Sequence, residues 1–178
     1  MPSESFEDFK KNNPHLDDVW PFLELLRQES DRGCVLISTG FLEQQLRDIL
    51  SAFMVEEKEA SSLLYGANAP LGTFSARITT CYTLALITEN EHHDLNQLRR
   101  MRNTFAHDIH TTFDTPSVKD RCATLRMKAH DYDSEELGPV RMTPQGQFQT
   151  AAVALIMNLV NRPHYVEKQR RTPQDWPY

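Results

Sequence analysis

The sequence predicts an all-α protein, a single helical bundle of about five to seven helices. Apolar residues recur mainly at steps of three and four positions, which is the spacing of an amphipathic helix. The chain has no pair of alternating runs joined by a hairpin turn signal, and capping signals precede several apolar stretches. Its 178 residues suffice for one domain with its own core. We therefore expect a domain over residues 15–162, an N-terminal extension at 1–14 and a flexible C-terminal tail at 163–178.

The first three helices are expected in the first third of the chain. Residues 14–30 have helical apolar spacing, and Pro21 is tolerated there if it lies in a first turn. Ser30 is a suitable N-cap for the next helix, whose broad apolar stripe continues to Met54. We expect this helix to be the central one. The acidic segment 56–62 is expected to add a short helix.

Four more helices are expected in the rest of the chain. Pro70 and Thr73 are alternative starts for one of them, and Thr88 and Glu91 are spaced as a capping box at the start of another. The region 110–143 contains prolines and a glycine and is expected to be irregular apart from one short helix. The four predicted helices run from 70 or 73 to about 85, from 89 to about 107, from 118 to 127, and from 147 to 161, where Pro163 is expected to end the last one.

The composition limits the classes of function. Asp and Glu number 25 against 19 Lys and Arg, a net charge of -6, so the whole molecule does not attract DNA as a basic repressor would. Three cysteines without a Cys-x-x-Cys pair indicate small core residues in a reduced cytosol. The polar N-terminus and the lack of an apolar run near ~20 residues indicate neither a signal peptide nor a membrane span. We expect a cytoplasmic protein.

The segment from Arg99 to Asp108 carries the clearest functional pattern. Arg99, Asn103 and His107 follow one another at i, i+4 and i+8 and form a polar ridge on one side of the helix. Arg102 lies about 140° from His107 around a helix, so the two can meet only if the helix ends near Ala106 or a second subunit contributes. A histidine can move protons at a ribose hydroxyl or a leaving oxygen, and a guanidinium can neutralise a phosphorane.

The spacing Arg102-Asn103-x-x-x-His107 resembles the signature of the HEPN superfamily of helical domains, many of which cleave RNA without a metal. The resemblance implies a symmetric dimer with paired Arg102 and His107 side chains in a cleft between protomers. It assigns catalytic roles to Arg102, Asn103 and His107. A structural explanation stands beside it, because the macrodipole favours a histidine at a helix C-terminus, where it can bond free carbonyls.

The wider context resembles the bacterial mannitol operon repressor family. The similar segments are Pro70-Leu71-Gly72-Thr73-Phe74-Ser75-Ala76-Arg77-Ile78, then Tyr82-Thr83-Leu84-Ala85-Leu86-Ile87, then the arginine-histidine segment. Arg77 lies on a largely apolar helix, where it should find a carboxylate, and Glu43 on the central helix is the expected partner. The resemblance implies a helical protein that represses a sugar-alcohol operon. The region after Thr111 shows no convincing match.

We therefore expect a transcriptional regulator that acts through protein contacts, with Arg99, Arg100, Arg102 and His107 as binding residues. The alternative function is a metal-independent endoribonuclease. We expect a homodimer and a protein partner, keep RNA as a second candidate, and do not expect direct DNA binding, since no recognition helix rich in exposed basic residues is present. The histidines around the motif do not follow a metal-ligand spacing and the chain has no Gly-rich phosphate loop, so no metal and no cofactor are expected.

Overall fold

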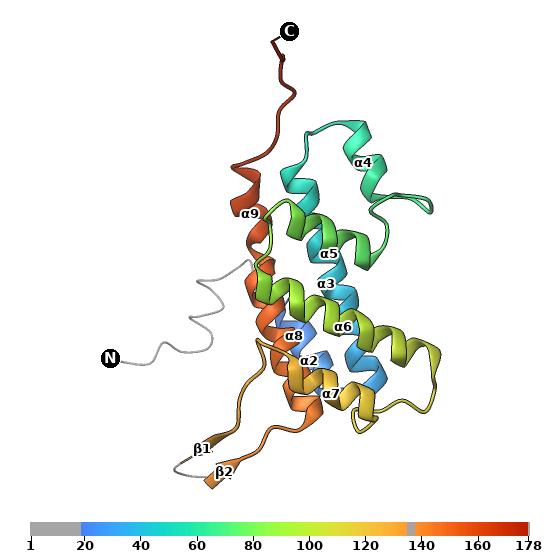
Figure 1. The fold of residues 1–178 in the computed structure, drawn as a ribbon, viewed down its shortest axis with the longest axis vertical. Helices are drawn as coiled ribbons and strands as arrows, with labels where there is room; N and C mark the ends of the chain where they lie inside the picture. Colours follow the sequence, from blue (N-terminus) through green and yellow to red (C-terminus); the bar gives the residue numbers. More distant parts are fainter. Residues whose placement is uncertain (1–18, 135–137, 178) are drawn as a thin grey trace, which may run out of the picture.

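The computed structural model describes residues 19–134 and 138–177, and the expected extension at 1–14 lies outside them. These residues form the predicted all-α bundle (Figure 1). If α8 and α9, which only Asn161 separates, are taken together, the described residues form seven helices. The elements are α2 (Val19–Gln28), α3 (Asp31–Phe53), α4 (Lys58–Leu64), α5 (Phe74–Thr83), α6 (Glu89–His107), α7 (Pro116–Thr124), β1 (Tyr132–Ser134), β2 (Gly138–Val140), α8 (Pro144–Val160) and α9 (Arg162–Glu167).

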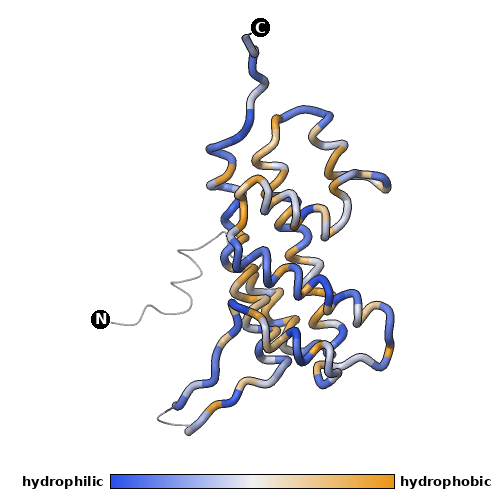
Figure 2. Tube along the Cα trace, in the orientation of Figure 1, coloured by the Kyte–Doolittle hydropathy of each residue, from blue (hydrophilic) through white to orange (hydrophobic). Residues whose placement is uncertain are grey.

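Helix α3 is the centre of the bundle, as its length and broad apolar stripe predicted. Ser30 caps its N-terminus, since the Ser30 hydroxyl accepts a hydrogen bond from the Gly33 amide. The helix packs against α5, α6, α8 and α9. Apolar segments gather inside this arrangement (Figure 2), and the fully buried side chains of Leu42, Leu46 and Ile49 lie in it. The tertiary packing of this helix therefore fixes where α5 and α6 meet it.

The starts of α5 and α6 follow from local capping. The Thr73 hydroxyl accepts a hydrogen bond from the Ala76 amide, which selects Thr73 over Pro70 as the start of α5. At the start of α6 the predicted capping box is complete: the Glu91 amide donates to the Thr88 hydroxyl and the Thr88 amide donates to the Glu91 carboxylate. These caps position the arginine-rich end of α6 over α3.

Two features differ from the sequence prediction. Helix α8 ends at Val160, close to the predicted end at 161, but a further helix follows, because α9 begins at Arg162 and holds Pro163 in its first turn, where the missing N–H removes no hydrogen bond. The region 110–143, expected to lack strands, holds a hairpin of three antiparallel residue pairs between β1 and β2. It is too short for alternation to be seen in the sequence, and Gly138 has the positive φ of 72° that a glycine adopts without strain.

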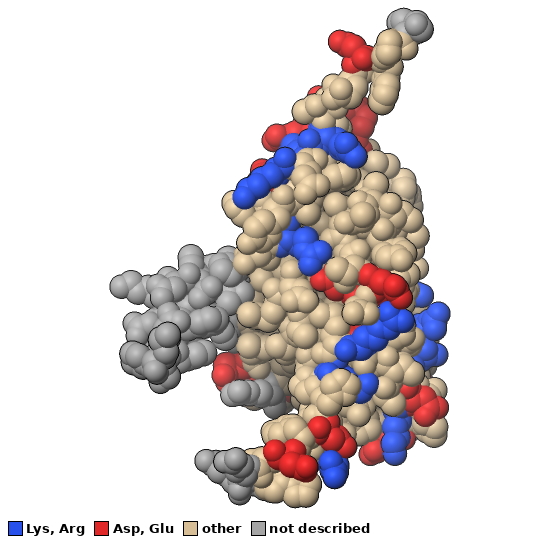
Figure 3. Space-filling view, turned by 60° about the vertical axis from the view of Figure 1, so that its left-hand side comes forward, with Lys and Arg blue, Asp and Glu red and all other residues tan. Residues whose placement is uncertain are grey.

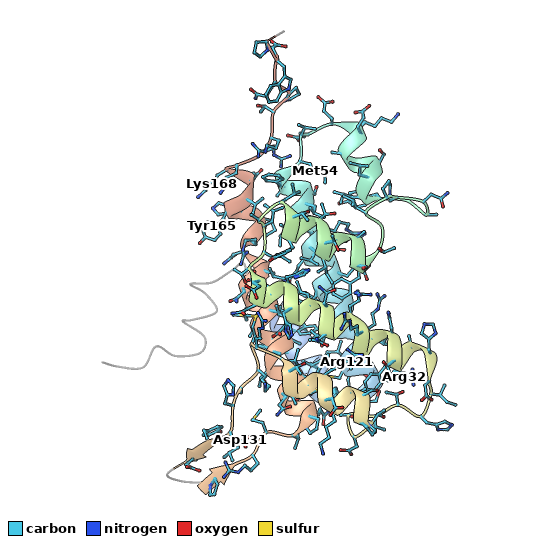
Figure 4. All side chains as sticks on the ribbon, in the orientation of Figure 1. Arg32, Met54, Arg121, Asp131, Tyr165 and Lys168 are labelled. Carbon is cyan, nitrogen blue, oxygen red and sulfur yellow. The ribbon has the colours of Figure 1, made fainter. Side chains whose placement is uncertain are left out.

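The chain beyond α9 contacts the end of α3. The Arg171 amide donates to the Phe53 carbonyl over 2.9 Å, and an Arg170 guanidinium nitrogen lies 3.4 Å from the Met54 carbonyl. Figure 4 labels Met54, Tyr165 and Lys168 at this end of the bundle, where α9 lies beside the end of α3. Within the described residues, no helix has both the length and the apolar character needed to cross a membrane.

Candidate functional site

The C-terminal half of α6 presents the predicted ridge at the surface. Arg100, Asn103 and His107 are exposed, and Arg99 is half-buried. The side of α6 opposite them is in the core, where Leu98, Met101 and Phe105 are fully buried. The exposed polar residues and the buried apolar residues lie on opposite sides of α6 because a helix has about 3.6 residues per turn. The ridge is therefore a solvent-facing surface on a rigid helix.

Arg102 takes a different position, turned towards α3. Its guanidinium lies 3.3 Å from one carboxylate oxygen of Glu43, and the other oxygen of that carboxylate lies 3.6 Å from the Arg77 guanidinium. The Glu43 side chain is 18% exposed, the Arg77 side chain 8% and the Arg102 side chain 36%. One carboxylate on α3 thus joins α5 and α6, and the Arg77–Glu43 pair expected from the sequence lies within ion-pair distance.

Arg77 also holds the turn that precedes α5. Its Nε donates to the Leu71 carbonyl over 2.9 Å, and its terminal nitrogens lie 3.3 Å from the Glu43 carbonyl and 3.4 Å from the Leu64 carbonyl. Gly72 is required in this turn, because a Cβ there would lie 2.8 Å from the Ala69 carbonyl oxygen. The turn at Pro70-Leu71-Gly72 therefore brings the Leu71 carbonyl within hydrogen-bond distance of the Arg77 guanidinium.

Arg102 and His107 do not converge within one chain. Helix α6 continues through His107, and the amide of the C-cap Asp108 still donates to the Thr104 carbonyl. The two side chains therefore keep the separation of about 140° that a continuous helix imposes. Arg102 faces α3, while His107 is exposed at the helix end. The early helix end at Ala106, one of the two conditions for their convergence, is absent.

The other basic side chains of α6 have different surroundings. Among the described residues, neither Arg99 nor Arg100 forms an ion pair within 4.0 Å, and the buried Nε of Arg99 has no hydrogen-bond partner. Arg32 of α3, labelled in Figure 4, donates to the Asp108 carbonyl over 2.7 Å and ties the loop after α6 to the bundle. The face that Figure 3 shows carries basic groups beside acidic groups rather than one continuous basic surface.

Two buried carboxylates organise the start of α6 and were not identified from the sequence in these roles. Glu91 pairs with Arg162 at 2.8 Å, and Arg162 also donates to the Leu86 carbonyl over 2.7 Å. Asp94 is fully buried and accepts hydrogen bonds from the Arg126 and Met127 amides. The capping box pointed to Glu91, but nothing in the local sequence pointed to a partner 71 residues away.

Two of the larger cavities lie away from this site. One of about 680 Å³ lies between α2 and α8 and is lined in part by Leu23, Leu26 and Val153. Another of about 670 Å³ lies along the C-terminal segment and is lined in part by Arg171 and Trp176. Within the described residues, no group of three or more His, Cys, Asp or Glu side chains is arranged to hold a metal ion. The candidate site on α6 is therefore a surface rather than a pocket.

Comparison with known proteins identifies a structural neighbour. No family model matches the chain, and no curated protein matches it in sequence. The structure is similar to a chain of the crystal structure described as the MtlR-HPr complex from Escherichia coli, with a TM-score of 0.56 and 18% sequence identity. The similarity covers 87% of this chain and 97% of that chain. The protein therefore shares its helical fold with a chain of that complex.

Proposed function

We propose that this protein is a regulatory binding module in transcriptional control, which acts through a protein partner rather than by direct DNA binding. The observation that carries the proposal is the division of the α6 motif: Glu43 holds Arg102 against α3, while His107 and the rest of the ridge face solvent. A single chain therefore offers a polar contact surface, and it does not offer an assembled catalytic pair.

Two further observations support this function. The structural neighbour is described as a complex of MtlR with HPr, so a protein of this fold is found with a protein partner. Its name agrees with the mannitol operon repressor family that the segments around Arg77 and His107 resemble. The net charge of -6 opposes tight binding to DNA, whereas a local basic ridge is suited to an acidic patch on a protein.

The proposal can be tested with Escherichia coli HPr as the probe. We expect the full chain to bind HPr in a calorimetric titration, and an Arg100→Glu variant to bind at least about tenfold more weakly, because the charge at the ridge is reversed. Lys58→Glu is a matched control, since Lys58 is also exposed but lies on α4. No binding by the wild type, or an equal loss in both variants, would contradict a ridge-mediated partner.

The nuclease alternative has a separate test. The full chain and a His107→Ala variant are incubated with single-stranded RNA in the presence of a chelator. We expect no cleavage by either. Cleavage by the wild type alone would overturn the proposed function and would require a second subunit to bring His107 to the Arg102 of its neighbour, because α6 keeps them apart within one chain. Light scattering of the purified protein would show whether the expected homodimer forms.

A further inference from the structure

One carboxylate serves two guanidinium groups where α5 and α6 meet α3. Arg77 of α5 and Arg102 of α6 both pair with Glu43, and the half-buried Arg99 of α6 forms no ion pair within 4.0 Å among the described residues. Arg99 lies one helical turn before Arg102, so the two guanidinium groups start from neighbouring positions on the same side of α6. In a protein with a net charge of -6, this concentration of cations at one point needs an explanation.

Arg77 does not depend on the Glu43 carboxylate for its hydrogen bonds. The carbonyls of Leu71, Leu64 and Glu43 itself lie within 2.9 to 3.4 Å of its guanidinium nitrogens. This set of backbone acceptors keeps Arg77 in place when the carboxylate moves. The Glu43 side chain, which is 18% exposed, is therefore able to loosen its 3.3 Å contact with Arg102 without unfolding the turn at Leu71.

Arg99 and Arg102 have donor capacity that the described residues leave unused. Among the described residues the Arg99 guanidinium forms no ion pair within 4.0 Å, and since its Nε is buried, an anion from solvent would reach its terminal nitrogens. Asn103, one turn after Arg99, is exposed and adds an amide donor. Ala106 follows one turn after Arg102, is exposed, and carries no side chain beyond Cβ that could cover the Arg102 guanidinium. An oxyanion fits such a set, since it accepts several N–H bonds at once.

We propose that Arg99 and Arg102, with Asn103, form an oxyanion-binding site on α6, and that Glu43 competes with the incoming anion for Arg102. The ligand is a phosphate or carboxylate group presented by the partner, so this inference rests on the proposed function and specifies the chemistry of its contact. Glu43 keeps Arg102 neutralised in the free protein. When the anion binds, Arg102 exchanges the Glu43 carboxylate for the anion, and Glu43 remains paired with Arg77.

The test uses two small anions and needs no protein partner. Inorganic phosphate and acetate are titrated separately into the folded full chain labelled with ¹⁵N, and the arginine Nε–Hε signals are followed by NMR. We expect both anions to shift the signals of Arg99 and Arg102. Tighter binding of phosphate would identify a phosphorylated partner group as the source, and equal or tighter binding of acetate would identify a side-chain carboxylate.

Three variants separate this site from general charge screening. Glu43→Gln should bind the anion about fivefold more tightly, because a competing charge 3.3 Å from the Arg102 guanidinium is removed. Arg99→Gln should bind it several-fold more weakly, while Lys58→Gln, which removes an exposed cation on α4, should bind it as the wild type does. Far-UV circular dichroism checks that each variant is folded.

The proposal is overturned if neither anion shifts the two signals, if chloride shifts them equally, or if Glu43→Gln leaves the affinity unchanged. Equal weakening by Arg99→Gln and Lys58→Gln would also overturn it. Because the titration contains no partner, failure here does not affect binding to HPr, and failure to bind HPr does not affect the titration.

Discussion

Replacing Glu91 by alanine should strongly destabilise the protein, because one carboxylate joins the start of α6 to the start of α9. Its side chain is 3% exposed, it accepts from the Thr88 amide over 2.7 Å, and it pairs with Arg162 at 2.8 Å. Removing it leaves Arg162, whose side chain is 24% exposed, with the Leu86 carbonyl as its remaining acceptor among the described residues.

The size of the expected loss in stability depends on how deeply the Glu91–Arg162 pair is buried. Breaking a fully buried ion pair by removing one partner costs about 3–5 kcal/mol, and an exposed pair contributes about 0–1 kcal/mol. The lost capping bond adds about 1 kcal/mol. Since water can still reach part of Arg162, we take the lower end of the buried range. With the capping bond added, the expected loss in the free energy of unfolding is about 4 kcal/mol.

The assay is urea unfolding followed by far-UV circular dichroism, with Glu89→Ala as the control. Glu89 lies in the same helical turn and pairs with Arg126 at 3.0 Å, but its side chain is 74% exposed. We expect this control to lose less than about 1 kcal/mol. A double-mutant cycle of Glu91→Gln and Arg162→Met isolates the coupling between the two side chains. The reasoning is refuted if Glu91→Ala is no more destabilising than Glu89→Ala.

Three other predictions follow from buried groups. Burial raises the pKa of Cys81 and Cys122 to about 12 and that of Cys34 to about 11. All three thiols should therefore react with a disulfide reagent only when the chain unfolds, and rapid reaction of the native protein would contradict this. Asp94→Asn should lower the free energy of unfolding by about 2–3 kcal/mol in urea melts, because asparagine keeps one acceptor oxygen and turns an NH2 donor towards one of the two amides, Arg126 or Met127, that the carboxylate accepts from. A change below about 0.5 kcal/mol would show that the lost bond contributes little. Burial, followed by the neighbouring charge of His93, lowers the pKa of His92 below its ordinary value of 6.5. The unfolded chain then binds a proton on His92 more readily than the folded chain does, so the free energy of unfolding should fall as the pH drops below 6.5. An NMR titration of the His92 ring should then show a midpoint below 6.5, and a midpoint at or above that value would contradict the lowered pKa.

Local signals in the sequence accounted for most of the helices. Ser30 and the Thr88–Glu91 pair act as caps where their side chains predicted, because an N-cap needs only residues within one helical turn. Thr73 rather than Pro70 starts α5, a choice that the sequence left open. The predicted end near residue 161 agrees with the end of α8 at Val160, but α9 was not foreseen, since a proline after a helix and a proline in the first turn of a new helix look the same in a sequence.

The candidate site depended more on tertiary structure. The helical spacing of Arg99, Asn103 and His107 determined that they share one side of α6, and the apolar residues between them determined which side faces the core. The expected partner of Arg77 was also accessible to sequence reasoning, because a buried guanidinium requires a carboxylate or carbonyls. The contact of Glu43 with Arg102 was not, because it depends on how α6 crosses α3, and Arg102 lies on a polar helix whose sequence does not require a buried partner.

By itself, then, the sequence determined the helical class, the capped helix starts and the composition of the ridge on α6. These properties depend on neighbouring residues and on a period of about 3.6, both of which are visible along the chain. Only the tertiary structure decided that Glu43 holds Arg102 against α3 and that Arg162 pairs with Glu91. Such contacts depend on how the helices cross, and the packing of α3 against α5, α6 and α9 sets those crossings.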